Sequence, residues 1–368
     1  MKKTILVALL SSSFLSPAFA TPSGITKDNY TDIKKLSEEV KNNPNDTGLL
    51  YLLANAYHKN NNTNEEIKIY NKITTMNPSF QYPYLNLGVI YADQGKTQQA
   101  INIYKQGIKN SKENKDIYLN LGTLYNQNKQ YDNALSAYKA AVGGGGISDS
   151  TAYTMIGHTY EELGKKPEAE ESYNKAINSE KVDYSSYINL GTFYYKNHRY
   201  DEAIKLYNKG LSLPVKDYHK EMMYSGLARN LTKLKKYDEA VNNLNSAIDL
   251  SKNNLRKSIN YMSLGNAYEG QGKNDDAAKA FETSIKISPK FSDSYYNLGE
   301  LYANNKQYDK AFEVYNTALN NIDSNKDLIY YGMAKTNEKK GDLIQAKSNY
   351  KKSCDLSNSA SCDWLKKH

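Results

Sequence analysis

Apolar and small side chains recur along the chain in a fixed order, with polar residues between them. The clearest example is the segment Tyr84-Leu-Asn-Leu-Gly-Val-Ile-Tyr91, and near copies of it start at Tyr118, Tyr187 and Tyr295. In each copy an alanine follows nine residues after the last tyrosine. The large side chains recur at the i, i+3, i+4 and i+7 spacing of one helix face. The pattern therefore predicts repeated pairs of amphipathic helices.

Nine copies of this unit can be laid out, starting at residues 47, 81, 115, 150, 184, 221, 258, 292 and 327, and together they cover 47–360. Position 8 is Gly or Ala in every copy, and position 20 is Ala except in the first copy, where it is Glu66. Small residues at these positions let two antiparallel helices approach closely. Positions 4, 11, 17 and 24 hold 26 of the 34 tyrosines. We expect these tyrosines to form the core between units rather than a surface for stacking ligands.

The spacing of 34 residues between the copies at 81 and 115 resembles the tetratricopeptide repeat, as does the order aromatic, Leu, Gly, Tyr, Ala, aromatic. The resemblance extends over nearly all of the chain after residue 46. It implies an all-α, right-handed superhelical solenoid of antiparallel helix pairs. It also implies a concave groove lined by positions 2, 5, 6, 9, 12 and 13 of each first helix.

Two short segments flank the repeats. Residues 21–46 place Leu36 and Val40 on one helix face, which predicts an N-terminal capping helix that ends before Pro44. Residues 361–368 predict a short closing helix, in which Trp364 takes the aromatic position of an unfinished tenth copy.

Two irregularities interrupt the repeat spacing. The run Gly143–Gly146 replaces the turn after the third copy and predicts a hinge. A phosphate-binding loop is the alternative interpretation, but no Lys-Ser or Lys-Thr follows the run. The fifth and sixth copies each carry three extra residues. Such an insertion is close to one helical turn, so it can lengthen a helix without rotating its apolar face.

The first twenty residues differ from the rest of the chain. Lys2 and Lys3 precede a short apolar stretch, and Ala18 and Ala20 stand where a signal peptidase prefers small side chains. We expect a secretory signal peptide over 1–20, cleaved between Ala20 and Thr21, with an amphipathic helix as the alternative. The protein is then exported to the periplasm or secreted. No other apolar run approaches the length of a membrane span.

Charge and candidate chemistry add little to this picture. The formal net charge is +8, it rests mainly on lysine, and mean hydropathy is -0.76. Nucleic-acid partners favour arginine-rich surfaces, so we expect none. Histidines are scattered, and only His158 has carboxylates nearby, at Glu161 and Glu162. We therefore expect no metal, no cofactor and no enzyme activity.

The predicted groove positions hold 8 acids and 6 bases, so the excess positive charge of the chain lies elsewhere. Candidate contacts with a partner are amides, exposed tyrosines and one arginine at these positions. They are Tyr51, Asn86, Asn120, Asn189, Tyr195, Arg229, Tyr296, Asn297 and Tyr331. The asparagines at position 6 allow two interpretations: an amide ladder for an extended peptide, or family consensus without a binding role.

These features favour an exported scaffold that binds an extended peptide or an envelope protein in its groove. The alternative is a helper module for envelope polysaccharide or for an associated envelope enzyme. The lysine clamp by which some relatives hold chaperone tails is absent, because Tyr51, Leu85, Asp116 and Asn120 occupy positions of that motif.

Cys354 and Cys362 are the only cysteines. A signal peptide directs the chain to an oxidising compartment, and a turn between two helices brings residues of this spacing close together, so we predict a disulfide. The spacing also resembles that of the cysteine-rich Sel1-like repeats. Two free buried thiols are the alternative.

Overall fold

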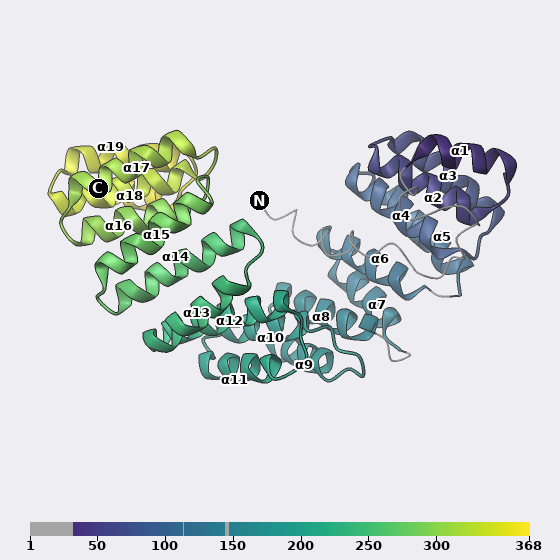
Figure 1. Ribbon diagram of the computed structural model, residues 1–368, viewed down its shortest axis with the longest axis horizontal. Helices are drawn as coiled ribbons and strands as arrows, with labels where there is room; N and C mark the ends of the chain where they lie inside the picture. Colours follow the sequence, from purple (N-terminus) through teal and green to yellow (C-terminus); the bar gives the residue numbers. More distant parts are fainter. Residues whose placement is uncertain (1–31, 113, 144–146) are drawn as a thin grey trace. The chain divides into compact units, whose positions relative to one another are not determined.

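The computed structural model describes residues 32–112, 114–143 and 147–368, and within them every regular element is a helix. The all-α prediction is therefore confirmed. The predicted signal peptide and its cleavage point at Ala20 and Thr21 lie outside the described residues. The chain divides into two compact units, which end and begin at Val182 and Asp183 and are described separately (Figure 1).

In its described residues, the first unit has one leading helix and four helix pairs, coloured purple to blue-green in Figure 1. Its helices are α1 (Ile33–Asn42), α2 (Thr47–Lys59), α3 (Thr63–Met76), α4 (Gln81–Asp93), α5 (Thr97–Asn110), α6 (Lys115–Gln127), α7 (Tyr131–Ala141), α8 (Ile147–Glu162) and α9 (Lys166–Ile177). The leading helix begins where Asp32 accepts a hydrogen bond from the backbone N–H of Lys35, and it buries Leu36.

The second unit has five helix pairs and a short last helix, coloured green to yellow in Figure 1. Its helices are α10 (Ser185–Lys196), α11 (Tyr200–Leu211), α12 (Asp217–Lys233), α13 (Tyr237–Leu250), α14 (Asn254–Gly270), α15 (Asn274–Ile287), α16 (Ser292–Asn304), α17 (Tyr308–Asn321), α18 (Lys326–Lys340), α19 (Leu343–Asp355) and α20 (Ser359–Leu365). Both α12 and α14 have 17 residues, so the extra residues lengthen these helices by about a turn.

The two helices of each pair meet where their side chains are small. A Cβ atom added at Gly122 would lie 2.6 Å from the ring of Tyr138, and one at Gly157 would lie 2.8 Å from the ring of Tyr173. Each ring belongs to position 24 of the same copy, so position 8 must be small to admit it. The eight alanines at position 20 are all fully buried.

The expectation that the repeat tyrosines form the core is confirmed at position 24 but is too broad elsewhere. All seven tyrosines of that position are almost fully buried. At positions 11 and 17 most tyrosines are half-buried, as are Tyr118 and Tyr153 at position 4. These rings lie at the edges of the helix pairs, where one side contacts the neighbouring helix and the other faces solvent.

The turn inside every helix pair uses one left-handed residue, always at position 15. Four copies have glycine there, with φ between 71° and 87°. The other five have Asn61, Lys129, His198, Lys235 and Lys306, with φ between 56° and 60°. A side chain in this conformation is strained. Five of the nine turns therefore have a small conformational free-energy penalty that glycine would avoid.

The glycine run after the third copy does not divide the core. One buried cluster includes Leu135 and Ala141 of α7 together with Ala152 and Ile156 of α8. Gly143 has a φ of 124°, and Gly144–Gly146 lie outside the described residues. The predicted hinge is therefore not where the chain separates into compact units, because the boundary falls one copy later.

Candidate interaction surface

Neighbouring first helices of the second unit lie side by side and exchange side-chain contacts. Asn304 of α16 donates to a carboxylate oxygen of Glu269 of α14 at 3.4 Å. Lys335 of α18 forms an ion pair with Glu300 of α16, and Lys339 donates to the amide oxygen of Asn304. All of these side chains occupy predicted groove positions. We call the surface that they share the first-helix face.

Aromatic rings continue this face toward the C-terminal end. The rings of Tyr296 and Tyr331 are stacked, with centroids 6.4 Å apart and an angle of 16° between planes. Tyr331 meets Tyr350 edge to face at 6.0 Å, and Tyr350 stacks on Trp364 at 4.2 Å. The ring of His368 covers the indole of Trp364 at 4.3 Å. Trp364 and His368 were not among the sequence candidates, because only the packing of the C-terminal residues against the buried ring of Tyr350 brings them to this row.

Glu338 ties the aromatic row to α18. It accepts hydrogen bonds from the hydroxyl of Tyr350 and from the indole N–H of Trp364, the latter at 2.8 Å. Both donors are neutral groups, and through them Glu338 positions two rings. Burial, then the bond to Glu338, raises the pKa of Tyr350. Burial likewise raises the pKa of Tyr296 to about 12, so both hydroxyls stay protonated at neutral pH.

The opposite end of the second unit presents a cation on an aromatic ring. The guanidinium carbon of Arg229 in α12 lies 4.2 Å from the ring centroid of Tyr195 in α10. Tyr195 in turn contacts the ring of Tyr200 at 5.7 Å. Arg229 is exposed, as is Lys233 one turn further along α12. The structure thus brings together two of the sequence candidates, Tyr195 and Arg229.

Three candidates in the first unit differ from the expectation. Tyr51 is only 5% exposed, because Tyr70, Phe80 and Tyr82 surround its ring. The prediction of an exposed tyrosine at this position is therefore wrong. The amide of Asn86 donates to the hydroxyl of Tyr70 at 2.7 Å and to that of Tyr51 at 3.3 Å.

Asn120 is 7% exposed, so it cannot present its amide to a peptide as the ladder interpretation requires. Asn189 and Asn297 are half-buried. The accessible asparagines at position 6 therefore do not form a continuous amide ladder. This favours the interpretation that asparagine is the family consensus there, without a binding role.

The one neighbourhood of histidine and carboxylates noted in the sequence serves the core. The Tyr173 hydroxyl lies 2.9 Å from Nδ1 of His158 and donates to the carboxylate of Glu161. Across the part of the chain that the structure describes, no three His, Cys, Asp or Glu side chains are grouped as a metal site would require. The helices of that part also include none with the length and apolar character of a membrane span.

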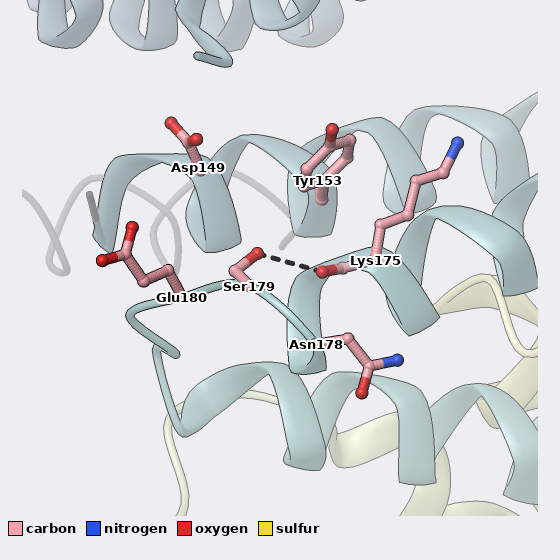
Figure 2. Close-up of a pocket in the computed structure, with 6 residues that line it drawn as sticks. All are labelled: Asp149, Tyr153, Lys175, Asn178, Ser179 and Glu180. Carbon is pink, nitrogen blue, oxygen red and sulfur yellow. Dashed lines mark hydrogen bonds between the residues drawn. The ribbon is translucent and has the colours of Figure 1, made fainter. Parts of the chain in front are cut away.

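A shallow pocket of about 320 Å³ lies at the C-terminal end of the first unit. Asp149, Tyr153, Lys175, Asn178, Ser179 and Glu180 line it (Figure 2). The hydroxyl of Ser179 donates to the backbone carbonyl of Lys175 at 2.9 Å, and the ammonium group of Lys175 pairs with Glu171 at 2.7 Å. The charges of Lys175 and Asp149 are therefore already partnered, Asp149 by Lys115 at 3.8 Å, and the lining shows no arrangement of a nucleophile and a base.

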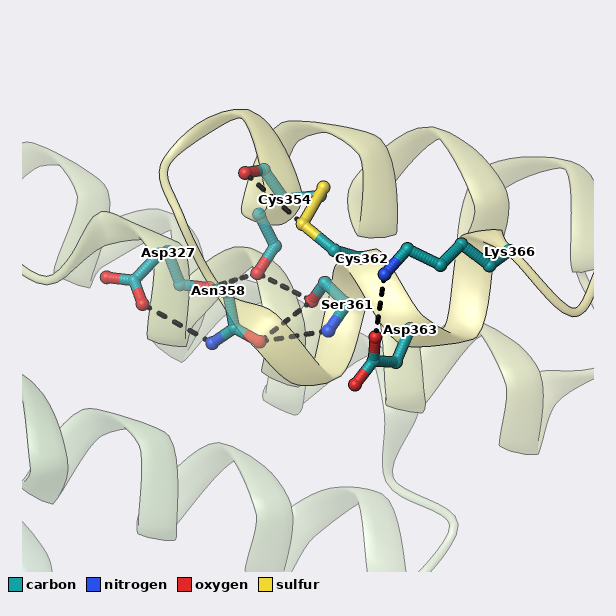
Figure 3. Close-up of a disulfide and its surroundings, with 8 residues drawn as sticks. Asp327, Cys354, Asn358, Ser361, Cys362, Asp363 and Lys366 are labelled. Carbon is teal, nitrogen blue, oxygen red and sulfur yellow. Dashed lines mark hydrogen bonds and ion pairs between the residues drawn. A yellow bond between two sulfur atoms is a disulfide. The ribbon is translucent and has the colours of Figure 1, made fainter.

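The last helix is tied to the repeats by a disulfide and by a polar network (Figure 3). Cys354 and Cys362 are bonded, with Cα atoms 4.8 Å apart, in agreement with the predicted pairing. Asn358 caps α20 by accepting from the backbone N–H of Ser361 at 3.0 Å, and its amide reaches Asp327 at 3.3 Å. The closing helix spans Ser359–Leu365 rather than residues 361–368.

The fold and this surface define a class: an all-helical solenoid of stacked helix pairs. Three models that describe the tetratricopeptide repeat match the sequence, over residues 85–149 and 262–326, over 219–290, and over 47–80, 150–183, 184–214 and 328–359. The chain belongs to the tetratricopeptide-repeat family. The comparison with curated proteins gives no match.

Several solved structures are similar to this chain at low sequence identity. The human IFIT1 dimer with m7Gppp-AAAA is 15% identical, with 93% of this chain and 86% of that chain covered and a TM-score of 0.51. The C-terminal part of a repeat protein from Cytophaga hutchinsonii is 18% identical, with 66% and 96% covered and a TM-score of 0.49. A tetratricopeptide repeat protein from Parabacteroides merdae is 15% identical, with 78% and 97% covered and a TM-score of 0.47. Tetratricopeptide repeats form scaffolds for protein–protein interaction.

Proposed function

We propose that this protein is an exported scaffold that binds an extended peptide or an envelope protein on its first-helix face, and that it acts by binding rather than by catalysis. The sequence of residues 1–20 supports export. The observation that supports the site is the stacked pair Tyr296 and Tyr331, which stands half-buried on the face that neighbouring first helices share. Tyrosines of this kind are common anchors of protein interfaces.

The test replaces Tyr296, Asn297 and Tyr331 together with Ala in the full chain. Crosslinking and pull-down from an envelope extract should then recover much less partner, since anchors typically cost at least about 1 kcal/mol each. A matched variant changes three exposed residues of the second helices, Lys286, Asn316 and Lys351, to Ala, and should retain capture. Unaltered capture by the first variant, with an unchanged helical spectrum, would contradict the proposed surface. Recovery of a polysaccharide in place of a protein would favour the helper-module alternative.

A further inference from the structure

The predicted groove positions of the second unit carry opposite charge at its two ends. In α10 and α12 they hold three bases and no acid: Lys196, Arg229 and Lys233. In α14, α16 and α18 they hold four acids and two bases: Glu269, Asp293, Glu300 and Glu338 against Lys335 and Lys339. The charge along this unit is therefore polarised rather than mixed.

At the basic end, Arg229 presents its charge at the surface of α12. Its guanidinium carbon lies 4.2 Å from the ring centroid of Tyr195, and the side chain is exposed. The Arg229 charge also acts on the hydroxyl of Tyr207, but a guanidinium has five N–H donors and can still form a charge-assisted hydrogen bond with a carboxylate. Lys233 lies four residues further along α12 and so shares the same face of that helix.

At the acidic end, the two lysines of the face do not neutralise all four carboxylates. Lys335 pairs with Glu300, and Lys339 donates to the neutral Asn304. Glu338 is held by the neutral donors of Tyr350 and Trp364. Burial raises the pKa of Glu269 and the nearby charge of Glu300 adds to the effect, while a hydrogen bond from Asn304 and the charge of Lys339 oppose it. Burial also raises the pKa of Asp293. A cationic ligand would lower the cost of these partly buried carboxylates.

We propose that the first-helix face of the second unit binds an extended peptide with divided charge, its acidic segment on Arg229 and Lys233 and its basic segment near Glu269 and Asp293. The inference rests on the proposed function and names the chemistry of the partner. Complementary potentials of this kind select partners and set their register.

The packing of the helices sets the length of a suitable probe. First helices α12, α14 and α16 contact one another in order, and packed helices lie about 8–10 Å apart. Two such steps span roughly 20 Å, which an extended peptide covers with about six residues. A decapeptide with four glutamates, Gly-Ser and four lysines places its charge centres at this separation.

The test measures binding of the fluorescein-labelled decapeptide to the full chain by fluorescence anisotropy. The reference peptide has the same composition with glutamate and lysine alternating. We expect the divided peptide to bind at least about tenfold more tightly at low salt, and to lose this advantage as salt screens the contacts. Equal affinity of the two peptides would overturn the proposal.

A charge-reversed variant locates the contact. Arg229→Glu with Lys233→Glu should abolish the preference for the divided peptide and strengthen binding of an all-lysine decapeptide. The matched control is Lys205→Glu with Lys209→Glu, two exposed residues with the same spacing on the second helix α11, and it should leave the preference unchanged. Equal effects of both variants would overturn the assignment to this face. If partner capture still depends on Tyr296 and Tyr331 while the two peptides bind with equal affinity, the scaffold function is supported and the proposed divided charge of the partner is wrong.

Discussion

Position 8 shows how single residues decide the packing of this fold. Gly122 leaves no room for a methyl group, since its Cβ would lie 2.6 Å from the ring of Tyr138. The sequence predicted that the residue at position 8 is small, because glycine or alanine recurs there in every copy. The recurrence reflects a local contact between the two helices of one copy, and such contacts repeat with the sequence.

We predict that Gly122→Ala lowers the free energy of unfolding by about 1–3 kcal/mol, since overpacking forces the ring of Tyr138 to move. Urea unfolding followed by circular dichroism measures the change. Tyr138→Leu frees space at the same contact, so the double variant should be more stable than the sum of the two single changes implies. Simple additivity of the two costs would contradict the proposed contact.

Glu66 stands at the position where the other eight copies have alanine. It is 2% exposed, and Nδ1 of His58 lies 3.2 Å from Oε1 of its carboxylate. Burial raises the pKa of Glu66 above its ordinary value of 4.5, and the charge of His58 opposes this. The folded protein therefore holds a proton on Glu66 at pH values where the unfolded chain has released it. By linkage, this residue makes the protein less stable as pH rises from 4.5 through the raised pKa.

We predict that Glu66→Gln removes this dependence. The free energy of unfolding of the variant minus that of the wild type should grow as pH rises through the same window. Urea titrations between pH 4 and about 8 measure the difference. Glu38→Gln, at an exposed position of α1, is the matched control and should show no such trend. If the difference in unfolding free energy between Glu66→Gln and the wild type does not change with pH, the carboxyl of Glu66 titrates alike in the folded and unfolded states.

At the scale of elements, α20 is the clearest case of a helix that its neighbours maintain. It has 7 residues, fewer than an isolated helix needs in water. The disulfide, the Asn358 cap and the stack of Trp364 on Tyr350 hold it in place. The sequence predicted the helix and the pairing. It did not predict its bounds, because the Asn358 cap starts the helix two residues earlier.

We predict that the bridge is formed in protein isolated from its native compartment. Intact mass should be about 2 Da below that of the reduced protein, with no uptake of alkylating agent in denaturant. Cys362→Ser should destabilise the C-terminal end by about 2.5 kcal/mol, the chain-entropy value for a loop of about nine residues. Hydrogen exchange of α20 measures this loss, with Ser357→Ala as a control at a nearby exposed turn position. Two alkylated thiols in the native protein would contradict the bridge.

At the scale of the whole molecule, the chain forms two compact units although its repeats run on without interruption in the sequence. The second unit holds its own buried clusters, one around Phe281 and Leu298 and another around Tyr295 and Tyr315. Because each repeat contacts mainly its neighbours, stability is close to a sum of local terms.

We therefore predict that residues 183–368 expressed alone fold to a helical state. Circular dichroism and a cooperative thermal transition test this expectation. A fragment of the same length, residues 93–278, begins at the last residue of α4 and ends within α15. It should be less stable, because α5 and α14 each lose most of the helix with which they pair. Comparable stability of the two fragments would show that the unit boundary has no energetic meaning.

The sequence by itself determined the repeat, the small residues inside each helix pair and the cysteine pairing. These depend on contacts between residues close in sequence, and repetition makes them visible. The tertiary structure alone decided which groove candidates are exposed. Tyr51 is covered by Phe80 at the end of its own copy and by Tyr82 of the next copy, whereas Arg229 lies exposed on the ring of Tyr195. Both outcomes depend on side chains about thirty or more residues away, whose volumes differ from copy to copy, and no local pattern encodes that difference.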